Sequence, residues 1–108
     1  MADLDPADQA QAVVDVRDEN GTPVIWLSGE LDMTSVPQVR VAIDAALASH
    51  PGRVILDASG LEYMDSSGIA LLASVASKAR EVQVRNPTSI VRRLIELTGL
   101  SQILRIIL

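Results

Sequence analysis

The chain has 108 residues and no cysteine, and its 14 acidic and 9 basic residues give a net charge of −5. This length suits one domain with a single core. The lack of cysteine excludes disulfides, thiol nucleophiles and cysteine metal sites. The single histidine, His50, cannot build a multi-histidine zinc site. The acidic balance opposes binding to a phosphate backbone, so we expect no nucleic-acid partner.

The first part of the chain, residues 1–11, is interpreted as a flexible N-terminal lead-in. It is acidic and has no apolar run, so it does not have the pattern of a signal peptide. No stretch of the sequence approaches the roughly 18 uninterrupted apolar residues of a membrane helix. We therefore expect a cytoplasmic protein with no membrane partner.

The folded part opens with the pattern of a β-hairpin. Residues 13–17 alternate and are rich in β-formers, and Asn20-Gly21 is a pair favoured in tight hairpin turns. Residues 23–28 follow as an almost wholly apolar strand, which is typical of a central strand covered on both faces. Trp26 is accordingly expected in the core.

The spacing of apolar residues then changes to that of a helix. One helical face is formed by Val36, Val39, Ile43, Ala46 and Leu47. Ser35 and Gln38 have the spacing of a capping box at its start. Pro51-Gly52 ends this helix, and residues 53–58 predict a short buried strand with Asp57 at its carboxyl end.

The rest of the chain predicts two more helices and two more strands. A heavily buried helix is expected over residues 66–79 and a strand over residues 81–85. The third helix has its apolar stripe at Ile90, Leu94 and Leu97. Gly99 is typical of a helix end, with Leu100 packing back on the last turn. Residues 103–108 predict the final strand.

The resulting order is β-β-α-β-α-β-α-β. It predicts an α/β domain whose mixed, mostly parallel β-sheet has an N-terminal antiparallel hairpin and right-handed crossover helices. In such sheets functional groups gather where strands end and helices begin. Two acidic segments are expected at such ends, residues 29–32 and residues 57–67.

The segment Asp65-Ser66-Ser67-Gly68 begins the second helix. Either Asp65 or Ser66 suits the N-cap, and a purely structural cap is the simpler interpretation. In a functional interpretation, free N–H groups and the helix dipole stabilise a phosphate on one of the serines. Repulsion from nearby carboxylates would then disturb a closely fitted partner more than the fold. The residues alone do not choose between Ser66 and Ser67.

The same residues make a poor enzyme site. His50 is expected at the far end of a helix from the serines, and no other base is available for a serine nucleophile. Three aspartates, Asp32, Asp57 and Asp65, are only a weak signal for Mg²⁺. We expect no catalytic residue, no metal and no cofactor.

Three segments resemble the STAS domain of bacterial anti-sigma-factor antagonists: GELD (29–32), VILDASGLEYMDSSGIALL (54–72) and NPTSIVRRLIELTGL (86–100). The resemblance extends over residues 12–107 in register, and it implies one STAS domain over residues 12–108. In that family the serine after the motif's aspartate is phosphorylated by an anti-sigma factor that is also a kinase. The resemblance therefore points to Ser66 as the phosphorylated residue.

The resemblance also implies a partner-binding site and a mechanism. The partner-binding residues would be Asp32, Asp65, Ser66, Ser67 and Gly68. The unphosphorylated protein would bind the anti-sigma factor, a serine protein kinase, and so free a sigma factor. Phosphorylation would end this binding and a phosphatase would restore it. The alternative is a STAS scaffold, or a subunit of a signalling or lipid-transport complex, without sigma-factor control. We expect a monomer or a weak homodimer.

Overall fold

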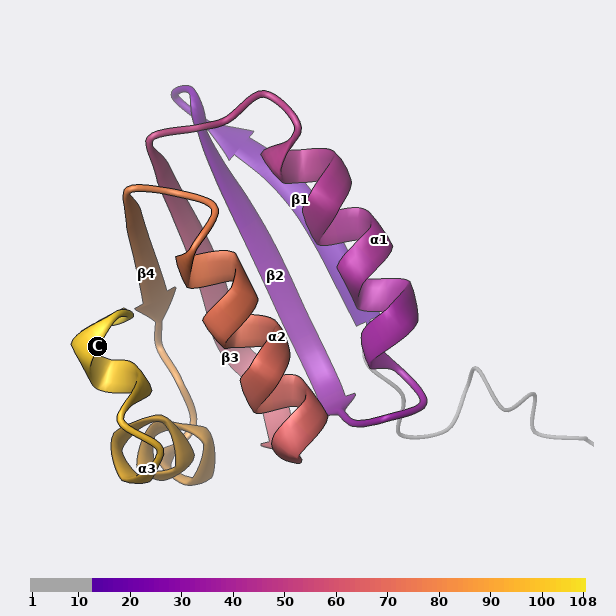
Figure 1. Cartoon of the computed structure of the whole chain (residues 1–108), viewed down its shortest axis with the longest axis vertical. Coiled ribbons are helices and arrows are strands. Elements are labelled where there is room, and N and C mark those ends of the chain that lie inside the picture. Colours follow the sequence, from indigo (N-terminus) through magenta and orange to yellow (C-terminus); the bar gives the residue numbers. More distant parts are fainter. Residues whose placement is uncertain (1–12) are drawn as a thin grey trace, which may run out of the picture.

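A computed structural model describes residues 13–108, so the expected lead-in over residues 1–11 lies outside the described residues. The described part is one α/β unit with a five-stranded sheet and three α-helices. Figure 1 shows the helices α1 and α2 lying side by side on one face of the sheet. None of the helices within residues 13–108 is long and apolar enough to cross a membrane.

The predicted hairpin is confirmed. Strand β1 (Val13–Glu19) pairs antiparallel with β2 (Thr22–Leu31), and Glu19 lies opposite Thr22. Both turn residues have positive φ, 56° at Asn20 and 88° at Gly21. This backbone geometry explains why the turn carries asparagine and glycine. Strand β2 continues to Leu31, beyond the expected end at residue 28.

The sheet has the expected mixed topology, with strands in the order β1-β2-β3-β4-β5. Strands β3 (Arg53–Met64), β4 (Glu81–Arg85) and β5 (Arg105–Ile107) all join in parallel. Strand β4 has the predicted bounds, whereas β5 is shorter than the predicted 103–108. Strand β3 is longer than the predicted 53–58 because it continues to pair with β2 across two register shifts.

Helices α1 (Val36–Leu47) and α2 (Ser66–Ala76) both begin at the end of the sheet where β2 and β3 end (Figure 1). They bury the predicted apolar faces, including Val39, Ile43 and Leu71, against the sheet. The capping box expected at Ser35 is wrong. The Ser35 hydroxyl donates to the carbonyl of Glu30 and makes no cap hydrogen bond, because the chain before α1 folds into a tight turn.

Helix α3 (Ser89–Leu97) lies beside the carboxyl-terminal half of β3, beyond the end of β4 (Figure 1). Its predicted apolar stripe is confirmed only at Leu94, which is partly buried against the core. Val91 and Ile95 are buried, whereas Ile90 and Leu97 are exposed. The expected glycine end is confirmed, because Gly99 has a φ of 79° and the short 3-10 helix η2 (Leu100–Gln102) buries Leu100.

The expectation that Trp26 is a core residue is wrong. Trp26 alternates with the buried Ile25 and Leu27, so its side chain lies on the sheet face away from α1 and α2, where it is 37% exposed. The guanidinium of Arg85 lies 5.1 Å from the centre of its ring. The same guanidinium pairs with the buried carboxylate of Asp57 at 2.8 Å. Charged side chains therefore lie on this face of the sheet.

Candidate functional site

Asp65 is the N-cap of helix α2. Its backbone is extended, and its Oδ1 accepts hydrogen bonds from the N–H groups of Ser67 at 2.8 Å and Gly68 at 3.2 Å. The same oxygen accepts the hydroxyl of Ser67 at 2.5 Å. Of the two residues that the sequence suggested for the cap, Asp65 fills the role, and it also engages the hydroxyl of Ser67.

Ser66 has a different environment from Ser67. It is the first residue of α2 and is exposed, and its hydroxyl makes no hydrogen bond to any of residues 13–108. The sequence suggested that free N–H groups at this helix start could receive a phosphate. That expectation is wrong for Ser67 and Gly68, because Asp65 already accepts from both N–H groups. A phosphate on Ser66 would therefore lie next to the carboxylate of Asp65, and it would not find the N–H groups of Ser67 and Gly68 free to bind it.

Gly68 is required by close packing. A Cβ at this position would lie 2.8 Å from the carbonyl oxygen of Leu31 and 2.8 Å from the Cβ of Met64. These atoms belong to the ends of β2 and β3, so the first turn of α2 lies directly against both strands. The glycine in the predicted partner-binding set thus fixes the position of the helix that carries Ser66.

Asp32 organises the turn between β2 and α1. Its Oδ1 accepts from the N–H of Thr34 at 3.0 Å, from the Thr34 hydroxyl at 2.7 Å and from the N–H of Ser35 at 3.1 Å. The backbone N–H of Asp32 in turn donates to the hydroxyl of Ser35 at 3.0 Å. Ser35 is only 2% exposed. The turn is therefore held by its own side chains.

The two loops form one surface because Asp65 contacts both. Its Oδ2 accepts from the N–H of Met33 at 3.3 Å, and its own N–H donates to the carbonyl of Leu31 at 3.0 Å. The predicted site residues of the Asp65–Gly68 segment thus lie next to the turn that contains Asp32. Sequence reasoning missed Met33, since its role here depends on a backbone N–H that no side-chain pattern reveals.

Asp57 does not belong to this surface, contrary to expectation. It lies within β3, and its side chain is 2% exposed. Burial raises the pKa of Asp57, but the hydrogen bonds from Ser59 and from Arg85 lower it by more. The pKa of Asp57 therefore lies below its ordinary value. Within residues 13–108 no three potential metal ligands are close enough together to hold a metal ion.

The carboxylates of Asp65 and Asp32 both ionise readily. The Ser67 hydroxyl bond holds the pKa of Asp65 below its ordinary value, and the Thr34 hydroxyl bond does the same for the pKa of Asp32. Among the described residues, neither carboxylate has a basic side chain within ion-pair distance. This end of the molecule therefore presents uncompensated negative charge at neutral pH.

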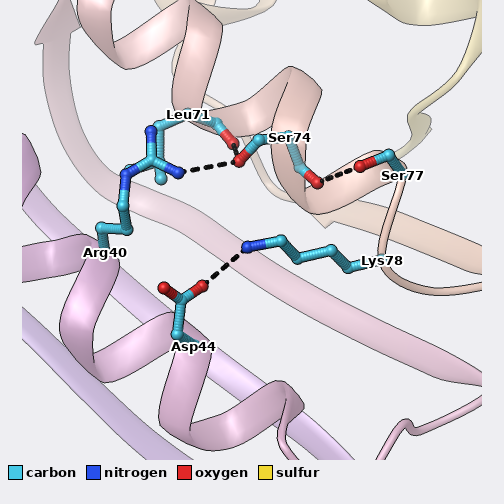
Figure 2. A network of polar contacts seen from close by, with 6 residues as sticks. All are labelled: Arg40, Asp44, Leu71, Ser74, Ser77 and Lys78. Atoms are coloured by element: carbon cyan, nitrogen blue, oxygen red, sulfur yellow. Dashed lines mark hydrogen bonds and ion pairs between the residues drawn. The ribbon is translucent and has the colours of Figure 1, made fainter.

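Two basic side chains of the helical layer are used elsewhere, as Figure 2 shows. Arg40 of α1 donates to the hydroxyl of Ser74 on α2 at 3.2 Å. Lys78 pairs with Asp44 of α1 at 2.9 Å. These contacts tie α1 to α2 along their seam. His50 follows the carboxyl end of α1, at the opposite end of this layer from Ser66.

Comparison with known proteins identifies the family. The family model described as "Mlab, STAS domain" matches residues 14–107. The chain belongs to the STAS-domain family. This STAS domain is 32% identical to the anti-sigma-F factor antagonist RsfB of Mycobacterium tuberculosis, over 86% of the chain and 79% of that relative. The resemblance to the STAS family is thereby confirmed, as the sheet topology confirms the predicted fold class.

Solved structures agree with this assignment. An anti-sigma factor antagonist from Mycobacterium paratuberculosis superposes on this STAS domain with a TM-score of 0.85 and 30% identity, covering 92% of this chain and 87% of that one. The anti-sigma factor antagonist SpoIIAA in its unphosphorylated form gives a TM-score of 0.72 and 27% identity over 89% of each chain. The phosphorylated form of SpoIIAA from Bacillus gives 0.68 and 25%, covering 89% of this chain and 92% of that one.

Proposed function

We propose that this STAS domain is an anti-sigma-factor antagonist. It binds an anti-sigma factor through the surface formed by Asp32 and the Asp65–Gly68 segment, and this binding frees a sigma factor. The anti-sigma factor acts as a serine kinase on Ser66, and the phosphorylated domain no longer binds. A phosphatase restores the unphosphorylated state. The chain itself carries out no catalytic step.

The observation that carries this proposal is the contrast between the two serines. The Ser66 hydroxyl is exposed and free of hydrogen bonds to residues 13–108, whereas the Ser67 hydroxyl donates to Asp65. A kinase needs an accessible hydroxyl, so the geometry favours Ser66. The names of the relatives support the role, and one solved relative is described in both unphosphorylated and phosphorylated forms.

Charge explains how a phosphate on Ser66 would end binding. It adds about −1.5 to −2 charges at neutral pH. Two unit charges 4 Å apart repel by about 1 kcal/mol in water and by about 4 kcal/mol in the effective dielectric near a protein surface. Ser66 adjoins Asp65, whose carboxylate already accepts hydrogen bonds from the N–H groups of Ser67 and Gly68. A partner that covers this surface would exclude water from the phosphate and from Asp65, and their repulsion would then rise. Binding would therefore weaken, while Asp65 still caps the helix.

The test uses the anti-sigma factors encoded in the source organism of the chain. Each is purified and titrated with the STAS domain, and each that binds is incubated with the domain and ATP before mass spectrometry. We expect at least one to bind and to phosphorylate Ser66. The Ser66→Ala variant should bind but accept no phosphate, and Ser67→Ala should still be phosphorylated. Phosphate on Ser67 alone would contradict the Ser66 assignment, and binding to none would favour a STAS scaffold outside sigma-factor control.

A further inference from the structure

One large apolar side chain stands in solvent beside the capped start of α2. Met33 is 76% exposed, although its backbone N–H donates to Asp65. Single exposed apolar residues are common on protein surfaces. Exposure alone therefore does not indicate a binding role for Met33, and the structure of the turn that carries it must be considered as well.

The turn that carries Met33 is held before any partner arrives. Asp32 accepts from two backbone N–H groups of the turn. The buried hydroxyl of Ser35 joins the turn to the carbonyl of Glu30 at 2.8 Å. Asp65 then ties the turn to α2. A contact residue on such a turn loses little backbone freedom on binding. The entropy cost of binding is therefore small, and this favours affinity.

Charge next to Met33 defines the chemistry of what can cover it. Asp32 directly precedes Met33 in the turn, and Asp65 accepts a hydrogen bond from the N–H of Met33. No basic side chain of residues 13–108 pairs with either carboxylate. A partner that covered Met33 with apolar groups alone would leave these carboxylates without water or a counter-charge, which is costly. The complementary surface therefore has an apolar pocket with basic groups at its rim.

We propose that Met33 is the anchor residue of this STAS domain, and that its side chain enters an apolar pocket of the anti-sigma factor. Lysine or arginine side chains at the rim of that pocket pair with Asp32 and Asp65. The inference rests on the proposed function. Methionine suits the role because its flexible, polarisable side chain adapts to a pocket. Since Met33 and Ser66 both adjoin Asp65, a phosphate on Ser66 lies at the edge of the anchor site. Its bulk would hold the pocket away from Met33, and the cost of removing its water would exceed what the basic rim returns.

The test compares two exposed apolar residues on different elements. Met33→Ser is matched by Leu97→Ser, since Leu97 of α3 is 70% exposed. Affinity for the anti-sigma factor that binds the wild type is measured by calorimetry. We expect Met33→Ser to weaken binding about tenfold or more and Met33→Leu to restore most of it. Leu97→Ser should stay within about twofold of the wild type, and all three variants should keep the wild-type melting temperature.

The outcomes separate this inference from the proposed function. Wild-type affinity in Met33→Ser would overturn the anchor and leave the proposed function standing. An equal loss in Leu97→Ser would also overturn it, because Met33 would then not be distinguished from another exposed residue. Binding that does not weaken with salt would overturn the basic rim of the pocket. Failure of the wild-type domain to bind any of the anti-sigma factors would overturn both proposals together.

Discussion

At the residue scale, the carboxylate of Asp65 gives two neighbouring serines different chemistry. It accepts from the backbone of Ser67 and Gly68 and from the hydroxyl of Ser67, and its second oxygen accepts from Met33. Ser66 takes part in none of these contacts. The residue types left the two serines equivalent, and the local geometry distinguishes them. Removing the carboxylate should therefore affect stability and the position of the loop together.

We predict that Asp65→Ala lowers the melting temperature by about 4–8 °C, the usual effect of losing an N-cap in a domain of this size. Asp65→Asn should lower it less, because the amide oxygen still caps the helix. The amide cannot accept at both sites, however, so the contact with Met33 is lost. Calorimetry of the three proteins checks this, and an unchanged melting temperature in Asp65→Ala would show that the cap contributes nothing.

Asp65 also predicts a pH dependence. Hydrogen bonds, first that from the Ser67 hydroxyl, hold its folded pKa below the ordinary value of 3.8. Its ionised form therefore contributes stability above that value, and the contribution is lost as pH falls through the folded pKa. The advantage of the wild type over Asp65→Asn should be full at about pH 6 and should shrink below about pH 4. A constant difference over that range in thermal unfolding would argue against the shift.

At the element scale, the first turn of α2 lies closer to the strands than any side chain would allow. We predict that Gly68→Ala destabilises the domain by about 1–3 kcal/mol, because a Cβ would meet backbone at Leu31 as well as Met64. Gly52→Ala is the matched control, since a Cβ there meets nothing within 4 Å. Urea unfolding compares the two, and equal effects would contradict the close approach.

On the sheet face away from α1 and α2, an ion pair between Asp57 of β3 and Arg85 of β4 stabilises the fold. Arg85→Ala leaves the carboxylate of Asp57 buried without its partner, so we predict a loss of about 3 kcal/mol. Arg53→Ala removes a more exposed ion pair with Glu81, so it should cost less than about 1 kcal/mol. Urea unfolding followed by the fluorescence of Trp26, the single tryptophan, measures both. A smaller loss in Arg85→Ala than in Arg53→Ala would be inconsistent with this account.

Local signals predicted the elements where local chemistry decides the structure. The hairpin turn at Asn20-Gly21, the bounds of β4 and the glycine end at Gly99 follow from short-range rules. The length of β3 does not, because its second half is a strand only through pairing with β2. The buried side of α3 could not be chosen either. Its apolar residues allow two overlapping stripes, and packing buries Val91 and Ile95 together with part of Leu94, while Ile90 and Leu97 stay exposed.

Most residues of the candidate site could be named from the sequence, but the hydrogen bonds between them could not. The strand-end rule pointed to the two segments that contain Asp32 and Asp65, and the resemblance to the STAS domain implied the individual residues Asp32 and Asp65–Gly68. Asp57 has the same residue type, and only the continuation of β3 beyond it shows that it lies elsewhere. Met33 had no sequence signal, because its link to Asp65 runs through a backbone N–H.

At the scale of the whole molecule, charge is distributed unevenly. Eight charged side chains of the strands pair with one another, and they are Asp15, Arg17, Glu19, Arg53, Asp57, Glu81, Arg85 and Arg105. Four are acidic and four are basic, so they add no net charge. The net charge of −5 therefore resides elsewhere: three of the five charges come from Asp3, Asp5 and Asp8, which precede the described residues, and the other two from the rest of the chain, where Asp32 and Asp65 have no ion-pair partner among residues 13–108. A further negative charge on Ser66 would therefore add to carboxylates that have no basic partner among residues 13–108.

The most direct test of the central claim compares the affinity of the anti-sigma factor for the unphosphorylated domain and for the domain phosphorylated at Ser66. Both forms are purified, their phosphate content is confirmed by mass spectrometry, and each is titrated by calorimetry. Two added charges beside Asp65 should weaken binding by a factor of about 100 or more, while the melting temperatures stay within a few degrees. Equal affinities for the two forms would contradict the account.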